Sequence, residues 1–498
     1  MKVKPSTYSL SHNLTSLCGM VMTALGFILG ATLIYIDVQR HFDNPYTGIL
    51  TYMVVPAILL GGLILILIGV LRERKRRKQS SGEIQHLPVI NLNDKKQFTT
   101  LVIVMVVTLL FISISVVGGY RAYHFTESVE FCGVTCHSVM KPEYTAYQNS
   151  PHANAGCTKC HIGPGADFFV KAKVNGLYQV YSTLFNKFSR PIPAPVHNLR
   201  PAKETCYTCH WPEKFFGATE LKRTYFRADE ENSPWTLQML VKVGGANTSL
   251  SHTKGIHWHM APDIKIEYIA ADEKRLEIPW VRMTVTGVDG VPTIFQTQEK
   301  SKQLTSAQIA SAEVRTMDCI DCHNRPTHQF HSPERALNEA LAAGILSPEM
   351  PEIKLNGIEV LTGKYETEGE ALMAIQEKLT EAYPDGGAQV KQAIDAIQTI
   401  YAQNIFPEMK VSWKEYPDHL GHMITPGCFR CHNGDHETPQ GQTITRECNA
   451  CHTIIAQGPG LNTTSISTGG LEFIHPEDID EEWKESRCDE CHEGVPVM

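Results

Sequence analysis

Charged residues and histidine are absent from three long stretches near the start of this 498-residue chain. Each stretch approaches the ~20 apolar residues that a helix needs to cross the hydrocarbon core of a bilayer. Buried helices of a soluble protein can also lack charge, but three such runs favour a membrane. No small-residue cleavage site follows the first run, which favours an uncleaved anchor over a signal peptide. We expect a membrane domain over residues 1–120, with transmembrane helices at Leu17–Ile36, Leu50–Leu71 and Thr99–Tyr120.

Unpaired cysteine is almost absent as well. Only Cys18 lies outside a spaced pair, and the other fourteen cysteines form six Cys-x-x-Cys-His motifs and one Cys-x-x-x-Cys-His motif. In such a motif the two thiols bond to the vinyl groups of haem, and the histidine binds its iron. Zinc knuckles, the main alternative, come in pairs and need no histidine in the next position. The motifs predict seven covalently attached c-type haems, at Cys132/Cys136/His137, Cys157/Cys160/His161, Cys206/Cys209/His210, Cys319/Cys322/His323, Cys428/Cys431/His432, Cys448/Cys451/His452 and Cys488/Cys491/His492.

Basic residues are scarce in the first loop and plentiful in the second. The loop Asp37–Gly48 contains only Arg40, whereas six basic residues lie between Arg72 and Lys78. Basic loops stay in the cytoplasm. We therefore expect the N-terminus on the cytoplasmic side of the bacterial inner membrane and everything after Tyr120 in the periplasm, where c-type haem is attached. A basic cluster beside a membrane helix indicates topology and lipid contact, so we expect no nucleic-acid partner. The chain has 53 acidic and 45 basic residues, and the acidic periplasmic part favours basic partners.

The periplasmic part divides by the spacing of its motifs. Residues 121–215 hold the first three motifs, 216–318 hold none, and 319–498 hold the remaining four. Alternating apolar residues at Ile264–Tyr268 and Val281–Val285, with a turn at Asp289-Gly290, predict a small β-rich insertion. Helix caps at Ser332-Pro333 and Thr367, and the apolar spacing from Val390 to Tyr401, predict helices in the last domain. We therefore expect three transmembrane α-helices and a haem-rich, mostly irregular and helical periplasmic part.

Six-coordinate haem iron needs a second axial ligand besides the histidine of its motif. The periplasmic part has twelve histidines outside the motifs, so several are not ligands. His257 and His259 would point the same way on a strand. Met140 lies three residues after His137 and is a candidate ligand of the first haem. The other histidines that we favour stand alone or beside a motif: His152, His197, His328, His419, His436 and His475.

The stretch Glu130–Gly165, with its Ser150-Pro151-His152 step, resembles the NapC/NirT family of membrane-anchored quinol dehydrogenases. The resemblance covers about residues 100–215 and the stretch 319–328, where His328 follows the fourth motif. With seven motifs and three spans, the whole chain is similar to inner-membrane cytochromes of the ImcH type. The family implies a lysine and an acid beside the first haem as the quinol site. Lys173 occupies the lysine position, the acid position holds Gln179, and the nearest carboxylate upstream is Asp167.

Histidine is missing from the three apolar runs, so they cannot hold b-type haem between two imidazoles. Electrons would then enter from a lipid-soluble carrier at the outer membrane surface. We expect oxidation of menaquinol and delivery of electrons to soluble periplasmic c-type cytochromes, in anaerobic or extracellular respiration. No Cys-x-x-Cys-Lys motif is present, but a terminal reductase for nitrite, hydroxylamine or a sulfur oxyanion stays open, as does an electron wire without a quinol site. The second and third spans leave room for a homo-oligomer or a partner membrane subunit.

Overall fold

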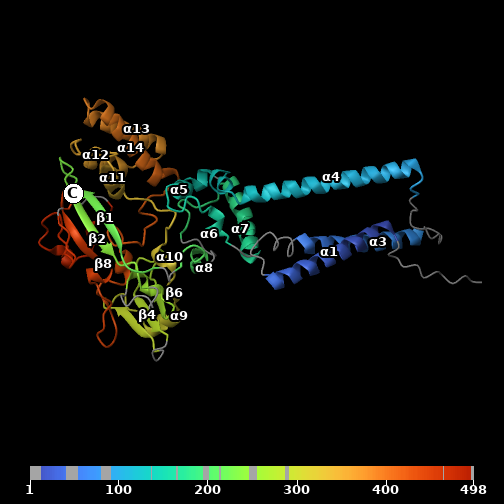
Figure 1. Ribbon diagram of the computed structural model, residues 1–498, viewed down its shortest axis with the longest axis horizontal. Helices are drawn as coiled ribbons and strands as arrows, with labels where there is room; N and C mark the ends of the chain where they lie inside the picture. The colour runs from blue at the N-terminus through green and yellow to red at the C-terminus, as the bar shows by residue number, and fades with distance from the viewer. Residues whose placement is uncertain are drawn as a thin grey trace, which may run out of the picture. The chain divides into compact units, whose positions relative to one another are not determined.

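The computed structural model describes residues 13–40, 54–79, 91–135, 137–163, 166–194, 201–211, 215–245, 255–286, 291–463 and 465–494. The chain divides into two compact units. The first unit comprises Met1–Phe131 and Cys157–Tyr181, and the second comprises Cys132–Gly156 and Ser182–Met498. Figure 1 shows the helices and strands of both.

The first unit contains a pair of antiparallel apolar helices, α1 (Leu14–Arg40) and α3 (Val55–Gln79). Within them Leu14–Leu33 and Val55–Arg76 are long and apolar enough to cross a membrane. Glycines let the backbones approach closely, because a Cβ on Gly19 would lie 2.6 Å from the carbonyl oxygen of Gly62. Gly26 also lies against α3. Such close packing of small residues is typical of helices in a bilayer.

The third predicted span falls within α4 (Lys95–Thr126). Asp94 caps this helix by accepting a hydrogen bond of 2.9 Å from the backbone N–H of Lys96. Much of the apolar part of α4 has side chains outside the described residues, so its passage through the membrane stays a prediction. Two spans are found in the described part, against the three expected.

Helix α7 (Ala166–Leu184) presents an unusual amount of apolar surface. The exposed fractions are 62% for Val174, 73% for Leu177 and 64% for Tyr178. With Val170 and Tyr181 these residues recur at helical spacing, and we call them the α7 apolar stripe. A stripe of this kind normally faces a partner or a lipid surface.

Helices dominate one part of the second unit: α5 (His137–Gln148), α11 (Pro333–Ala342), α12 (Ile353–Thr362), α13 (Glu368–Ala382) and α14 (Gly387–Asn404). The predicted caps are present, since the side chains of Ser332 and Thr367 accept hydrogen bonds from the third helical residue of α11 and α13. Pro384, Asp385 and Gly386 lie between α13 and α14. Figure 1 shows α11 to α14 gathered in one group.

The core of this group is closed to solvent. Leu337, Ile375, Leu379 and Ile397 all have 0% exposed surface, and Phe226 from the neighbouring strand packs into the same cluster. The burial follows the periodicity of the sequence, since the buried positions lie on one face of each helix.

We expect Ile397→Ala to destabilise the second unit by about 2–5 kcal/mol, because a fully buried side chain would leave a cavity. Met373→Ala on α13 is the matched control, since Met373 is 67% exposed. Chemical denaturation of the haem-bound protein, followed by circular dichroism, measures both. Equal midpoints for the two variants would contradict the burial of Ile397.

Two antiparallel sheets complete the second unit. The first has the order β1-β2-β8, formed by Thr219–Phe226, Pro234–Val241 and His452–Pro459. The second has the order β6-β3-β4-β5-β7, formed by Arg315–Thr316, Ile264–Ile269, Trp280–Val285, Thr293–Thr297 and His436–Glu437. The expected strands are β3 and β4, while the Asp289-Gly290 turn lies outside the described residues. Strands from beyond residue 319 therefore complete both sheets.

The remaining described elements are short. They are η2 (Phe131–Thr135), α6 (Cys157–His161), α8 (Ala202–Cys206), η4 (Ile256–Met260), α9 (Ser306–Ser311), α10 (Cys319–Cys322), η5 (Pro407–Met409), η6 (Gly427–Arg430), η7 (Cys448–Ala450), η8 (Glu482–Lys484) and α15 (Cys488–Cys491). Our prediction of a strand at His257 and His259 is wrong. The segment is the 3₁₀ turn η4, because backbone hydrogen bonds join Trp258 N to Gly255 O and Ala261 N to Trp258 O.

Candidate functional site

Five of the six Cys-x-x-Cys-His motifs lie at short helical turns, α6, α10, η6, η7 and α15, and the third motif begins at Cys206, the last residue of α8. In four of them the N–H of the histidine donates to the carbonyl oxygen of the first cysteine, at 2.8 Å for His210 and His323, 3.0 Å for His432 and 2.9 Å for His492. Residues four apart on a helical turn lie on the same side. The turn therefore places the histidine on the side of the first thiol, as one bound haem requires.

The cysteines of these motifs differ in exposure. Cys160, Cys209, Cys448 and Cys491 are exposed, whereas the other described motif cysteines are half-buried. Haem attachment at each individual motif stays a prediction from its Cys-x-x-Cys-His spacing.

Five motif histidines each face one histidine from elsewhere in the second unit. The separations of the ring centroids span only 5.8–6.3 Å, although the angles between the ring planes range from 4° to 87°. The pairs are His152–His210 at 6.0 Å, His257–His323 at 6.3 Å, His259–His432 at 5.8 Å, His422–His452 at 6.2 Å and His475–His492 at 6.2 Å. We call them the five imidazole pairs.

These separations fit two imidazoles on opposite sides of one haem iron. A ligating nitrogen lies about 2 Å from a first-row metal ion and about 1 Å from the centre of its own ring, which gives about 6 Å between centroids. Burial lowers the pKa of His259, His323 and His432, as it does for His422, His452 and His492. In these six rings burial therefore favours the neutral form, the state in which a ring nitrogen can bind metal.

Zinc knuckles receive no support from the arrangement. Among the described residues, no group of three or more His, Cys, Asp or Glu side chains is placed to hold a metal ion between them. A haem site needs only one histidine on each face of the porphyrin, which is what the imidazole pairs provide.

Two of the favoured histidines have other partners. His419 Nδ1 lies 3.1 Å from Asp321 O and its Nε2 lies 3.0 Å from Lys274 O. His436 Nδ1 lies 3.0 Å from Asn433 Oδ1 and its Nε2 lies 2.6 Å from Ile278 O. Both rings are buried, and both nitrogens of each face protein oxygens. These contacts do not favour His419 and His436 as iron ligands, and their ligation stays a prediction.

The other expected ligands fall into three cases. His328 Nδ1 lies 3.0 Å from the carbonyl oxygen of Glu143 and 3.0 Å from its carboxylate, so this ring is held by protein oxygens. Met140 lies on α5, while the side chain of His137 is outside the described residues. His197 and Cys136 are outside them too. Ligation by these residues stays a prediction.

Sequence reasoning missed His422. The residue is half-buried, and its ring faces His452 and stacks on Phe429 of the fifth motif at 4.3 Å. Nothing in the local sequence distinguishes it from His419, three residues earlier. Only the fold separates the two, because it turns one ring to carbonyl oxygens and the other to a motif histidine.

Lys173 lies in a polar cluster in the first unit. Its Nζ is 2.5 Å from Glu127 Oε1 and 3.3 Å from Thr126 Oγ1. The Tyr123 ring lies 5.9 Å from the same Nζ. Helix α4 ends at Thr126, so the cluster joins the C-terminal end of α4 to α7, next to the α7 apolar stripe.

Two further residues that we associated with Lys173 lie on the same helix. Gln179 is exposed on α7, and an amide cannot take up a proton as a carboxylate can. The side chain of Asp167 lies outside the described residues. The carboxylate that contacts Lys173 is that of Glu127. Sequence reasoning missed it because Glu127 precedes Lys173 by 46 positions and is not one of the residues that the family resemblance suggested.

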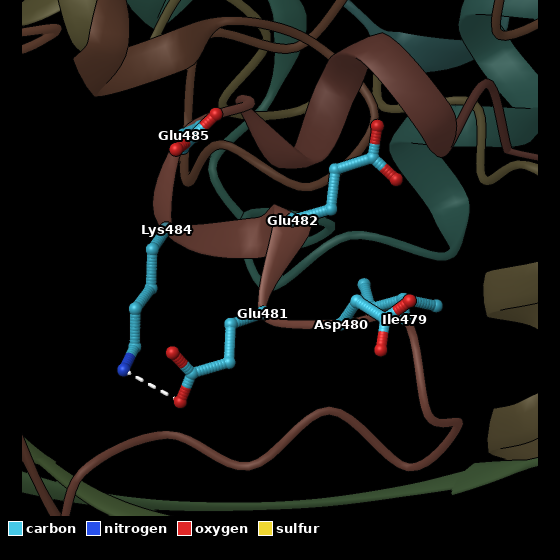
Figure 2. A pocket seen from close by; sticks show the side chains of 6 residues that line it. All are labelled: Ile479, Asp480, Glu481, Glu482, Lys484 and Glu485. Atoms are coloured by element: carbon cyan, nitrogen blue, oxygen red, sulfur yellow. Dashed lines mark hydrogen bonds and ion pairs between the residues drawn. The ribbon is translucent and has the colours of Figure 1, made fainter.

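A shallow acidic hollow lies just before the last motif (Figure 2). Asp480, Glu481, Glu482 and Glu485 line it with Ile479 and Lys484, and Lys484 Nζ lies 2.8 Å from Glu481 Oε1. Neither cysteine nor histidine is among these six residues, so the hollow is not a haem site. Its charge adds to the acidic surface of the second unit.

The apolar helices, the motif turns and the imidazole pairs define a membrane-anchored multihaem cytochrome c. The model of the NapC/NirT cytochrome c family, N-terminal region, matches residues 93–193. The cytochrome c-type protein ImcH of Geobacter sulfurreducens is 41% identical over 491 residues, which cover 96% of this chain and 95% of that protein. The chain therefore belongs to the NapC/NirT family of electron-transfer cytochromes c and holds haem covalently. No solved structure matches it.

Proposed function

We propose that this protein oxidises menaquinol at the periplasmic face of the inner membrane and passes the electrons to soluble periplasmic c-type cytochromes. The observation that carries this proposal is the contact of 2.5 Å between Lys173 and Glu127 beside the α7 apolar stripe. A quinol dissolves in lipid, so a site that oxidises it needs polar groups next to a surface that faces the membrane. The exposed apolar residues of α7 provide such a surface.

The reaction breaks both O–H bonds of the quinol, forms two carbonyl groups, and releases two protons and two electrons. The ammonium group of Lys173 would donate a hydrogen bond to one quinol oxygen and hold it in place. The carboxylate of Glu127 would accept the proton of that hydroxyl and give it up to periplasmic water, while the proton of the second hydroxyl, on the opposite side of the ring, would pass to water. When bound, the haems supply one-electron acceptors, seven of them if every motif is occupied.

Glu127 takes the role that the family resemblance led us to seek at Gln179 or Asp167. It follows the last residue of α4 and precedes Cys132 of the first motif by five positions. A base at this point of the chain is close in sequence both to the predicted membrane span and to the first haem. The arrangement would release protons on the side that receives the electrons.

We infer the point at which electrons leave the protein from the charge of its surface. The acidic hollow precedes the last motif, and the chain as a whole has eight more acidic than basic charges. An acidic surface raises the encounter rate with basic partners. We therefore place delivery to soluble cytochromes at the seventh motif.

The terminal-reductase hypothesis loses support from the imidazole pairs. A reductase needs an iron with an open position for its substrate, whereas five motif histidines already face a second histidine. The coordination of the haems at the first two motifs stays a prediction.

Anaerobic stopped-flow reduction of the purified protein by a menaquinol analogue tests the proposal. We expect rapid reduction of the wild type and a 10–100-fold slower reaction for Lys173→Ala, because a hydrogen bond from a charged group contributes about 1.5–3 kcal/mol. Lys171→Ala is the matched control, since Lys171 is exposed on the same helix. It should react as the wild type does.

Each other outcome has a definite meaning. No reduction by quinol, in protein that dithionite reduces fully, would contradict the function. Rapid reduction that is unchanged by Lys173→Ala would keep the function and contradict the site. Equal slowing by Lys171→Ala and Lys173→Ala would indicate a loss of positive charge on α7 instead of a specific contact.

A further inference from the structure

We infer that His152, His257, His259, His422 and His475 are the sixth ligands of the haems held by the third to the seventh motif, in that order. The inference does not depend on the quinol site, because it concerns only the five imidazole pairs of the second unit. Each motif histidine from His210 onwards has one partner, and no partner is shared.

Other aromatic pairs in this protein have centroid separations of 4.3–6.4 Å, so the imidazole pairs are distinguished by which rings they join. In each of the five, a motif histidine faces another histidine, and the separation stays within 5.8–6.3 Å whether the planes are parallel or perpendicular. A central iron fixes the distance between two ligating nitrogens and leaves each ring free to rotate about its bond to the metal.

The nitrogens that would face away from the iron are also arranged as in metal sites. A metal-bound histidine usually donates its other N–H to a carbonyl or carboxylate, which orients the ring. The Nδ1 atoms lie near backbone carbonyl oxygens in His152 (3.2 Å, Pro326), His257 (2.6 Å, Val243), His259 (2.7 Å, Ile256) and His475 (2.9 Å, Glu477). The motif ring of His432 has the same contact, 2.9 Å from Thr445 O. Nε2 is thereby left for the iron in His152, His257 and His259, while the Nδ1 of His475 also lies 3.2 Å from the backbone N–H of Glu477.

His422 is held differently. Its Nδ1 is buried and has no hydrogen-bond partner within the described residues, and the same is true of His452 Nδ1. The ring is positioned by stacking on Phe429 instead. No hydrogen bond within the described residues therefore competes with the iron for Nδ1 of His422.

The pairing implies an order of haems in space. One five-residue turn, η4, carries both His257 and His259 and so would hold the haems of the fourth and fifth motifs side by side. Helix α8, which ends at Cys206, meets the start of α10, because the N–H of Lys203 donates to Asp318 Oδ2 at 3.1 Å; this contact brings the third motif next to the fourth. The third, fourth and fifth haems would therefore follow one another in space as their motifs do along the chain.

Removal of single ligands in the haem-bound protein tests the assignment. His422→Gly and His475→Gly should each convert one haem from low spin to high spin, seen by electron paramagnetic resonance, with the haem content unchanged. Each variant should gain one carbon monoxide site when reduced, and added imidazole should restore the low-spin signal. His419→Gly is the matched control and should stay low spin, because both ring nitrogens of His419 face carbonyl oxygens.

A second substitution keeps the test decisive if a glycine variant fails to assemble. His422→Met retains a ligand, and histidine–methionine iron has a higher potential than bis-histidine iron. One step of a redox titration should move upwards while the others stay in place. Unchanged spin states in both glycine variants, an unmoved titration in His422→Met, or a high-spin signal from His419→Gly would overturn the assignment.

Discussion

Asp321→Ala should destabilise the second unit by about 3–5 kcal/mol, the usual cost of removing one partner from a buried ion pair. Asp321 lies within the fourth motif and is 1% exposed. Its Oδ1 accepts hydrogen bonds from the Tyr268 hydroxyl at 2.7 Å, from Arg315 Nε at 2.7 Å and from Arg275 Nη1 at 3.1 Å. Without this carboxylate, two partly buried guanidinium groups would lose their counter-charge.

The same network fixes the fourth haem site to the second sheet. Burial, with a contribution from the Asp321 carboxylate, raises the pKa of Tyr268, so that this hydroxyl keeps its proton and remains a donor. Tyr268 belongs to β3 and Asp321 to α10, directly between Cys319 and Cys322. Loss of Asp321 should therefore lower the yield of protein that carries the full number of haems, besides lowering its stability.

Asp318→Ala is the control for this prediction. Asp318 caps the same turn, since its Oδ1 accepts from Cys319 N at 2.6 Å, and loss of a cap costs about 1 kcal/mol. Denaturation of the haem-bound variants and haem quantification on purified protein measure both effects. An Asp321→Ala variant as stable as Asp318→Ala would refute the role of the buried network.

The sequence was informative wherever the signal was local. The motif turns, the caps of α11 and α13, and strands β3 and β4 follow from residues within a few positions of one another. The segment from Ile256 to Met260 misled because its alternation of apolar residue and histidine resembles a strand. Backbone hydrogen bonds from Gly255 to Ala261 instead close a 3₁₀ turn, and Pro262 follows it.

The partners of the motif histidines could not be predicted, because they depend on tertiary contacts. His257 and His323 are 66 positions apart in the chain, and His152 and His210 are 58 apart, so no periodicity relates them. His419 and His422 differ only in the direction in which the folded loop turns their rings. Glu127 was missed for the same reason, since its contact with Lys173 is made by two separate helices.

Glu127→Gln should slow quinol oxidation by about 10²-fold or more, within the range of 10²–10⁴ that a general base contributes. Glutamine keeps the shape of the side chain and a hydrogen-bonding oxygen for Lys173, but it cannot take up a proton. Glu130→Gln is the matched control, because Glu130 is exposed three positions further along the chain. Stopped-flow reduction by the menaquinol analogue measures both variants, and only Glu127→Gln should react slowly.

The double variant Lys173→Ala/Glu127→Gln decides whether the two residues act together. Groups in direct contact give non-additive effects, so the double variant should be little slower than Glu127→Gln alone. If the rate losses of the two single variants multiply in the double variant, Lys173 and Glu127 act independently, and binding by Lys173 is separate from proton transfer. If Glu127→Gln reacts at the wild-type rate while Lys173→Ala remains slow, water and not Glu127 accepts the quinol protons, and Lys173 serves only to orient the quinol.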